Sequence, residues 1–243
     1  MLLKCIRAEN LKLRHSCIWA ACVLIPLIPA VMGTFNYQNN LGVLTREWYS
    51  LWTQITLFYS SLFYAPLIGL YCSYLWRLEH LNNNWNVLMT NPVPVRNVFL
   101  AKLAVVYWVT LLTQLWIGVL YFLCGKLCGL PGMIPGQILV WLLRGTLAAA
   151  AVGTLQLLLS MVIRSFSVPI GISLTGSILG FIISNKGYSM YWPYSVMLLG
   201  MNANKSEDSL RHGPIPFLVS LCAFFLLFTG ISIWYLKEKD VRA

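Results

Sequence analysis

Charged side chains are scarce in this sequence, and acidic ones are the scarcest. Only 10% of the 243 residues are Asp, Glu, Lys or Arg, and 7 residues are acidic, whereas about 25% of a soluble domain is charged. Hydrophobic residues make up 58% of the chain, and its mean hydropathy is +0.71. A soluble fold of this length could not cover so much apolar surface. The composition therefore excludes a soluble domain and predicts an integral membrane protein.

Motifs for catalysis and nucleotide binding are also missing. The sequence contains no GxxxxGK[ST] run for phosphates, no HExxH zinc motif and no CxxC pair. Its three histidines, His15, His80 and His212, lie at the edges of the apolar runs or between them. We therefore predict no catalytic, cofactor-binding or metal-ligating residue in this chain, and no enzymatic activity of its own.

The 7 cysteines are odd in number, and most lie within apolar runs, where cysteine behaves as a small hydrophobic residue. Cys124 and Cys128 are one helical turn apart. This spacing leaves both a disulfide and two free thiols open.

Long stretches without charge predict the fold. A membrane-spanning helix needs about 20 predominantly apolar residues, and lipid offers no partner to backbone groups outside a helix or a closed barrel. The alternating strands of a barrel are absent. We therefore predict an all-α integral membrane protein with one domain, 1–243, and six transmembrane helices at about 17–35, 53–76, 99–124, 137–163, 167–184 and 214–236.

The net charge of +10 is explained by the membrane rather than by nucleic acid. Basic residues stand at the ends of the apolar runs, and no basic patch alternates with aromatic residues, so nucleic acid is excluded as a partner. Six spans place both termini on one side, and the segments on that side carry 11 Lys and Arg, Lys102 included, against 6 on the other. The positive-inside rule then predicts cytoplasmic termini in a multi-pass protein of the cell membrane.

The segment before the sixth span is long and partly apolar. Its aromatic residues, Tyr188, Tyr191, Trp192 and Tyr194, are candidates for facing a substrate. The segment could form a re-entrant or interfacial helix, or a loop packed on the spans. Arg144 is a charge inside the predicted fourth span, where it could reach the headgroups, pair within the protein, or face the substrate.

Small residues recur at helical spacing in two spans. Such residues let two membrane helices approach closely, and the pattern leaves open whether the contact is within the chain or between chains. The residues concerned are Gly145, Ala149 and Gly153 in the fourth span, with Gly176 and Gly180 in the fifth.

The connection between the second and third spans resembles an amphipathic helix that stops before Pro92 and Pro94. Such a helix could lie on the inner leaflet or dock in a groove on a cytoplasmic partner. One face would carry Leu78, Leu81, Trp85, Leu88 and Met89, with Glu79 beside them.

Three features together resemble the permease subunits of type-2 ABC exporters, and are most similar to the lantibiotic-immunity permeases. The start, Arg7-Ala8-Glu9-Asn10-Leu11-Lys12-Leu13-Arg14, is similar to the family's AExxK amphipathic lead-in helix. The stretch Trp76-Arg77-Leu78-Glu79-His80-Leu81-Asn82-Asn83-Asn84-Trp85, followed by Asn91-Pro92-Val93-Pro94, is similar to its loop between spans two and three. Six spans with a large segment before the sixth match its layout.

The resemblance implies a function that composition alone does not give. The loop carrying Glu79 and Trp85 would be the coupling helix on a separate ATPase, which would be present in two copies and would bind the ATP and Mg²⁺. A second, different permease would complete the pump, and the cargo would be a cationic amphipathic peptide expelled from the bilayer of a Gram-positive bacterium. The residues themselves leave two alternatives open: an ABC-2 permease for a lipid, a drug or another peptide antibiotic, and a membrane scaffold without transport.

Overall fold

The computed structural model describes residues 1–81, 84–85, 90, 93–210 and 213–238, and these form helices without any strand. The elements are α1 (Leu2–Leu13), α2 (Ile18–Leu24), α3 (Leu27–Asn39), α4 (Glu47–Phe58), the π-helical turn η1 (Tyr59–Phe63), α5 (Tyr64–His80), α7 (Val95–Leu127), α8 (Gly136–Val162), α9 (Ser167–Asn185), the 3₁₀ turn η2 (Ser189–Tyr191), α10 (Pro193–Gly200) and α11 (Ile215–Glu238).

The predicted fold class is confirmed. Six helical stretches in the described part of the chain are long and apolar enough to cross a membrane, and each overlaps one predicted span: Ile18–Asn39, Glu47–His80, Val95–Leu127, Gly136–Val162, Ser167–Asn185 and Ile215–Glu238. The second and third stretches extend beyond the predicted 53–76 and 99–124. The prediction ended these spans at charged residues that the structure includes in the helices.

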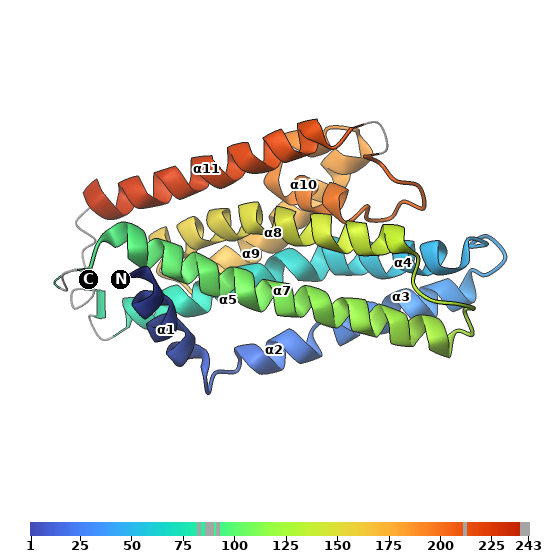
Figure 1. Ribbon diagram of the computed structural model, residues 1–243, viewed down its shortest axis with the longest axis horizontal. Helices are drawn as coiled ribbons and strands as arrows, with labels where there is room; N and C mark the ends of the chain where they lie inside the picture. The colour runs from blue at the N-terminus through green and yellow to red at the C-terminus, as the bar shows by residue number, and fades with distance from the viewer. Residues whose placement is uncertain (82–83, 86–89, 91–92, 211–212, 239–243) are drawn as a thin grey trace.

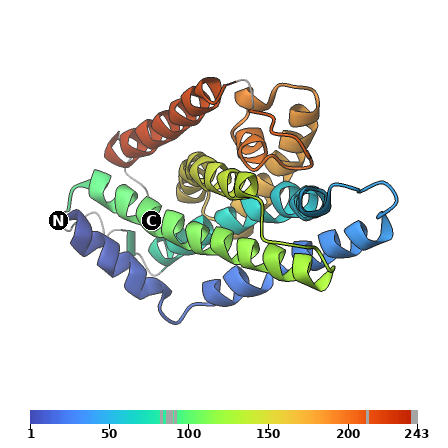
Figure 2. The same cartoon turned by 45° about the vertical axis from the view of Figure 1, so that its right-hand side comes forward.

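The spans pack side by side with α8 near the centre, in contact with α5, α7, α9, α10 and α11. Figures 1 and 2 both place α11 on one side of the bundle and the pair α2–α3 on the other. We call the end that carries α1 and the last turns of α5 and α11 the proximal end. The other end, which carries the α3–α4 connection and α10, is the distal end (Figure 1).

Two of the spans are irregular. The first is divided at Pro26 into α2 and α3, because proline lacks the N–H that would continue the helix. The second contains the π-helical turn Tyr59–Phe63 between α4 and α5. A serine of α9 bonds to this turn, since the Ser177 hydroxyl donates to the carbonyl oxygen of Ser60 at 3.0 Å.

The apolar segment before the sixth span forms the short helix α10, packed between α8 and α9. All eight residues of α10 are buried, and Trp52 of α4 donates its indole N–H to the carbonyl of Met201 just beyond it at 3.0 Å. The segment is thus a helix packed on the spans.

The small residues singled out in the sequence lie against neighbours within the chain. A Cβ atom at Gly145 would lie 2.2 Å from Met201 Cγ, and one at Gly176 would lie 2.5 Å from Tyr194 Cε2. A Cβ atom at Gly180 would lie 3.1 Å from the backbone nitrogen of Ser195, whereas one at Gly153 would lie 3.7 Å from Val106 Cγ1. Ala149 is buried in the same helix as Gly145 and Gly153.

A further close approach had no signal in the sequence analysis. A Cβ atom at Gly33 of α3 would lie 2.5 Å from the Cα atom of Ile55 in α4. Side-chain movement cannot relieve a clash with backbone, so the α3–α4 contact depends on glycine at this position.

Candidate functional site

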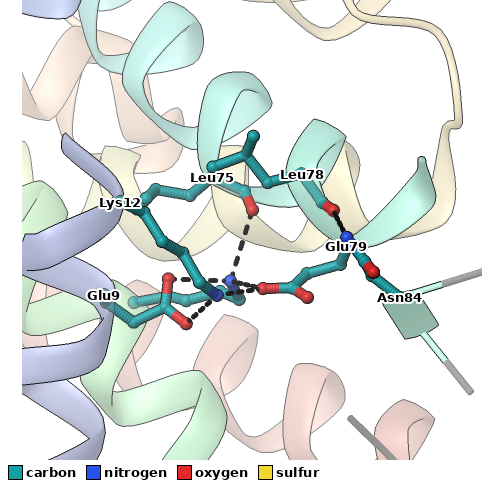
Figure 3. A network of polar contacts seen from close by, with 7 residues as sticks. Glu9, Lys12, Leu75, Leu78, Glu79 and Asn84 are labelled. Carbon is teal, nitrogen blue, oxygen red and sulfur yellow. Dashed lines mark hydrogen bonds and ion pairs between the residues drawn. The ribbon is translucent and has the colours of Figure 1, made fainter. Parts of the chain in front are cut away.

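Four charged side chains meet at the proximal end, and we call Glu9, Lys12, Glu79 and Lys102 the proximal charge cluster. Glu9 and Lys12 come from α1, Glu79 from the last turn of α5, and Lys102 from the second turn of α7. Figure 3 shows the carboxylates of Glu9 and Glu79 turned toward one another across the gap between their helices, with Lys12 reaching in from α1.

Lys102 occupies the centre of the cluster. Its side chain is 0% exposed, and its Nζ atom lies 2.9 Å from Glu9 Oε2 and 2.8 Å from Glu79 Oε1. The ammonium group also donates to the carbonyl of Leu75 at 3.3 Å and sits 4.9 Å from the centre of the Trp76 ring. Removing an ammonium group from water costs several kcal/mol. A buried ammonium group therefore needs this complete set of partners, because their attraction must offset that cost.

Lys12 connects the cluster to the protein surface. Its Nζ atom lies 2.7 Å from Glu9 Oε1 and also pairs with Glu79. Partial burial disfavours the charged form of Lys12, but the carboxylates of Glu9 and Glu79 outweigh this and raise its pKa above the ordinary lysine value. The four side chains together carry two negative and two positive charges, so the cluster is neutral overall.

An aromatic stack extends from the cluster toward the connection between α5 and α7. The Trp85 ring lies parallel to His80, with centroids 5.7 Å apart, and 5.2 Å from Trp76. His80 Nε2 lies 3.3 Å from the carbonyl oxygen of Ser160 in α8. The stack therefore ties the start of the connection to both α5 and α8.

Glu79 and Trp85 are buried, at 5% and 3% exposure, and both contact residues of the same chain. Their role in coupling to an ATPase stays a prediction. The predicted continuous amphipathic helix is wrong, because α5 ends at His80 and Leu81 has extended backbone angles. The Leu81 side chain is 46% exposed and Leu78 is half-buried, while Leu88 and Met89 lie outside the described residues.

Sequence reasoning overlooked Lys102 as a site residue and assigned it to a connecting segment, although it falls within the predicted span 99–124. Its position was the signal, because a charge within a membrane span is normally paired or functional. For Glu9 and Lys12 the sequence signal was the AExxK-like pattern of the lead-in helix, which does not show their partners. The structure brings these three together with Glu79.

Arg144 lies far from this cluster, near the distal end of α8. Its Nη1 atom is 2.8 Å from Asp208 Oδ1, and Gln137 donates to the same carboxylate at 2.7 Å. The side chain of Arg144 is 20% exposed, and that of Asp208 is 15% exposed. Arg144 is therefore held in an ion pair within the chain, one of the three roles that the sequence left open.

The aromatic residues singled out as facing a substrate do not share one surface. Tyr188 and Tyr191 are 61% and 79% exposed. Trp192 is half-buried and donates to the carbonyl of Gly176 at 2.9 Å. Tyr194 is buried and accepts a hydrogen bond from Gln156, so its side chain serves packing between α8, α9 and α10.

Cys124 and Cys128 are both free thiols. Within the described ranges, no group of three or more His, Cys, Asp or Glu side chains is placed to hold a metal ion.

The family model described as "ABC-2 family transporter protein" matches residues 5–180, which include most of α1, the whole proximal charge cluster and most of the first five spans. This match covers well over half of the chain. The chain belongs to the ABC-2 family of transporter proteins. No curated protein and no solved structure showed significant similarity to it.

Membership gives this ABC-2 permease its general role. It is a multi-pass membrane component of a transporter, and it works with an ABC ATPase as its partner. In this permease, the proximal charge cluster joins the N-terminal helix α1 to the second and third spans. It lies near the start of the connection between these two spans.

Proposed function

We propose that this permease receives the work of its ATPase at the proximal end and uses it to expel lantibiotic-type peptides from the bilayer, together with a second, different permease. The observation that carries the coupling step is the burial of Lys102 between Glu9 and Glu79. Three helices pinned at one point move as a unit, so a push on the α5–α7 connection would reach α1 and both spans.

The surface of this connection supports the location of the ATPase. Leu81 exposes an apolar side chain directly after α5, within two residues of Glu79. The resemblance to type-2 ABC exporters implies an ATPase contact in this connection, so an apolar side chain exposed there is available to the partner. In this proposal Leu78 and Leu81 contact the ATPase, while Glu79 and Trp85 hold the connection in place from beneath.

The orientation follows from the charge distribution. With 11 basic residues on the side of the termini against 6 on the other, the proximal end would face the cytoplasm, where ATP is available. The distal end would then face outward, toward a peptide that approaches the outer leaflet.

The cargo rests on the resemblance to lantibiotic-immunity permeases in the lead-in helix, the connection after the second span and the overall layout. A cationic amphipathic peptide partitions into the outer leaflet, where the exposed rings of Tyr188 and Tyr191 offer apolar and polar contacts. A pump that removes such a peptide before it forms pores would protect the cell.

The cargo is tested by expressing the permease with its ATPase and second permease in a sensitive host. We expect the inhibitory concentration of at least one lantibiotic to rise, and to fall back when the ATPase is catalytically dead. An unchanged inhibitory concentration for every lantibiotic, with all three subunits present in the membrane, would remove the immunity role and leave the permease with another cargo.

The docking position of the ATPase is tested separately with Leu81→Asp. A charge at this exposed position should weaken ATPase association without unfolding the bundle. Leu127→Asp is the matched control, because Leu127 is 83% exposed at the distal end. Equal ATPase co-purification by the two variants would contradict the proposed docking position.

A further inference from the structure

The side of α1 that is turned away from the bundle is both basic and apolar. At about 100° per residue, five exposed residues fall within an arc of about 100°, and we call them the outer face of α1: Leu3, Lys4, Arg7, Leu11 and Arg14. The two leucines are 74% and 67% exposed. Large apolar side chains therefore alternate with cations on one exposed face.

The opposite side of the same helix holds α1 on the bundle. Glu9 and Leu13 are its buried residues, and Glu9 pairs with Lys102 of α7 at 2.9 Å. Glu9 lies about 170° around the helix from the middle of the outer face. The ion pair to Lys102 therefore turns the outer face away from the spans.

The three cations of the outer face have no partner in the described part of the chain. The side chains of Lys4, Arg7 and Arg14 form no hydrogen bond, ion pair or ring contact there. Glu9 is the one acidic residue of α1, and it is buried in the proximal charge cluster. The outer face thus presents three positive charges and no negative one.

Two contacts place this face at the edge of the membrane. Glu9 of α1 reaches Lys102 in the second turn of the third span. Trp19, at the start of the first span, is 37% exposed and donates its indole N–H to the carbonyl of Leu13 at 2.8 Å. Tryptophan is enriched at the level of the lipid headgroups. Figure 1 shows α1 at this end of the bundle, at an angle to the long spans.

The composition of the face matches that of a lipid surface. In an amphipathic helix at this depth, Lys and Arg pair with anionic headgroups while leucines enter the boundary of the acyl chains. A nucleotide or free phosphate would neutralise the cations, but it offers no apolar group to Leu3 and Leu11. An anionic phospholipid satisfies both kinds of side chain.

We propose that the outer face of α1 binds anionic phospholipids of the leaflet at the proximal end. Lys4, Arg7 and Arg14 pair with the phosphates, and Leu3 and Leu11 lie among the acyl chains. The binding requires neither the ATPase nor the peptide cargo.

Lipid binding should reach the proximal charge cluster, because the outer face and Glu9 lie on opposite sides of one helix. A lipid that holds the outer face on the membrane surface keeps Glu9 beside Lys102. We therefore expect anionic lipid to stabilise the permease against unfolding, since it binds the folded chain.

The binding test uses the purified full chain in a maltoside detergent, with phosphatidylglycerol or zwitterionic phosphatidylcholine added at equal concentration. Native mass spectrometry measures the lipid that the protein retains, and wild type should retain more phosphatidylglycerol. Arg7→Gln with Arg14→Gln should lower the affinity for phosphatidylglycerol by roughly fivefold or more, the effect of one basic side chain at an anionic surface. Arg7→Lys with Arg14→Lys keeps both charges and should retain the preference.

The matched control is Arg164→Gln with Lys237→Gln. It removes two charges from other exposed positions at the proximal end and should keep the wild-type affinity. Phosphatidylglycerol should also raise the unfolding midpoint of wild type more than that of Arg7→Gln with Arg14→Gln. Without lipid these two proteins should unfold at the same midpoint, because the substituted side chains are exposed and unpaired.

Two further arms concern the source of the phosphate and the leucines. Inorganic phosphate, which has no acyl chain, should not displace phosphatidylglycerol. Leu11→Gln leaves every charge in place and should weaken the binding of both lipids. Displacement by inorganic phosphate would assign the face to a soluble anion, and full lipid binding by Leu11→Gln would contradict the role of the leucines.

The proposal is overturned if wild type retains the two lipids equally, or if the α1 variant and its matched control lose phosphatidylglycerol alike. Unchanged lipid binding with loss of ATPase co-purification in Arg7→Gln with Arg14→Gln would assign the face to the ATPase instead. Failure of this test leaves the immunity and Leu81→Asp measurements unaffected, because neither of them follows lipid binding.

Discussion

The ammonium of Lys102 lies 2.8 Å from the carboxylate of Glu79, and both side chains are almost completely removed from solvent. The two residues belong to consecutive membrane spans, and their charges stand near the end of each. Glu9 closes the arrangement from α1 at 2.9 Å. The pair therefore fixes how the lead-in helix and two spans sit relative to one another.

Lys102→Met should destabilise the protein strongly, because it leaves Glu9 and Glu79 buried with only Lys12 to compensate them. Breaking a buried ion pair by removing one partner costs about 3–5 kcal/mol. The thermal unfolding midpoint of a detergent-solubilised fluorescent fusion measures the effect. Lys186→Met, at an exposed lysine, should change stability by no more than about 0.5 kcal/mol, and equal midpoints would refute a stabilising role for the cluster.

Alanine at Gly176 and at Gly153 should have opposite consequences. At Gly176 the new Cβ would lie 2.5 Å from the Tyr194 ring, and overpacking of this kind costs about 1–3 kcal/mol. At Gly153 the nearest atom is 3.7 Å away, so alanine should be neutral or slightly favourable in the helix. The measurements are the expression level and the unfolding midpoint of the two variants. An equal loss of stability in both variants would argue against the helix contacts described above.

Arg144→Asp should lower stability or assembly, since it places two carboxylates together at a site that is only partly exposed. The exchanged pair Arg144→Asp with Asp208→Arg should recover part of this loss. Membrane abundance and unfolding midpoint of the single and double variants provide the measurement. Absence of any recovery would indicate that Arg144 acts on something other than Asp208.

Reporter fusions near Lys205 and after Ala243 should report opposite sides of the membrane, with the C-terminal reporter in the cytoplasm. Lys205 follows α10 at the distal end, whereas α11 ends at the proximal end (Figure 1). The excess of basic residues on the side of the termini gives the direction. Reporters on the same side would contradict the topology.

Much of the fold could be predicted because lipid requires each span to be a helix of about 20 predominantly apolar residues. Runs of apolar residues located the six candidate membrane spans found in the described part of the chain. The errors concern charge. The predicted second span ended before Arg77, whereas the helix continues to His80, and Lys102 was assigned to a connecting segment although it lies within a helix.

The site could be predicted only in part, since its residues are far apart in the chain. Lys102 pairs with a residue 93 positions away and another 23 positions away. A local pattern cannot show such partners, so Glu79 and Trp85 were interpreted as a surface for another protein. Leu81, which the same pattern placed on one face with Trp85, is 46% exposed.

The π-helical turn Tyr59–Phe63 fixes the number of residues in the second span. A π turn accommodates more residues than an α turn, and each residue advances a helix by about 100°. Deleting one residue here would rotate the distal half of the span against the proximal half. Trp52 would turn away from the Met201 carbonyl while Glu79 stayed on Lys102. The span should therefore tolerate many substitutions, yet neither a deletion nor an insertion of a single residue.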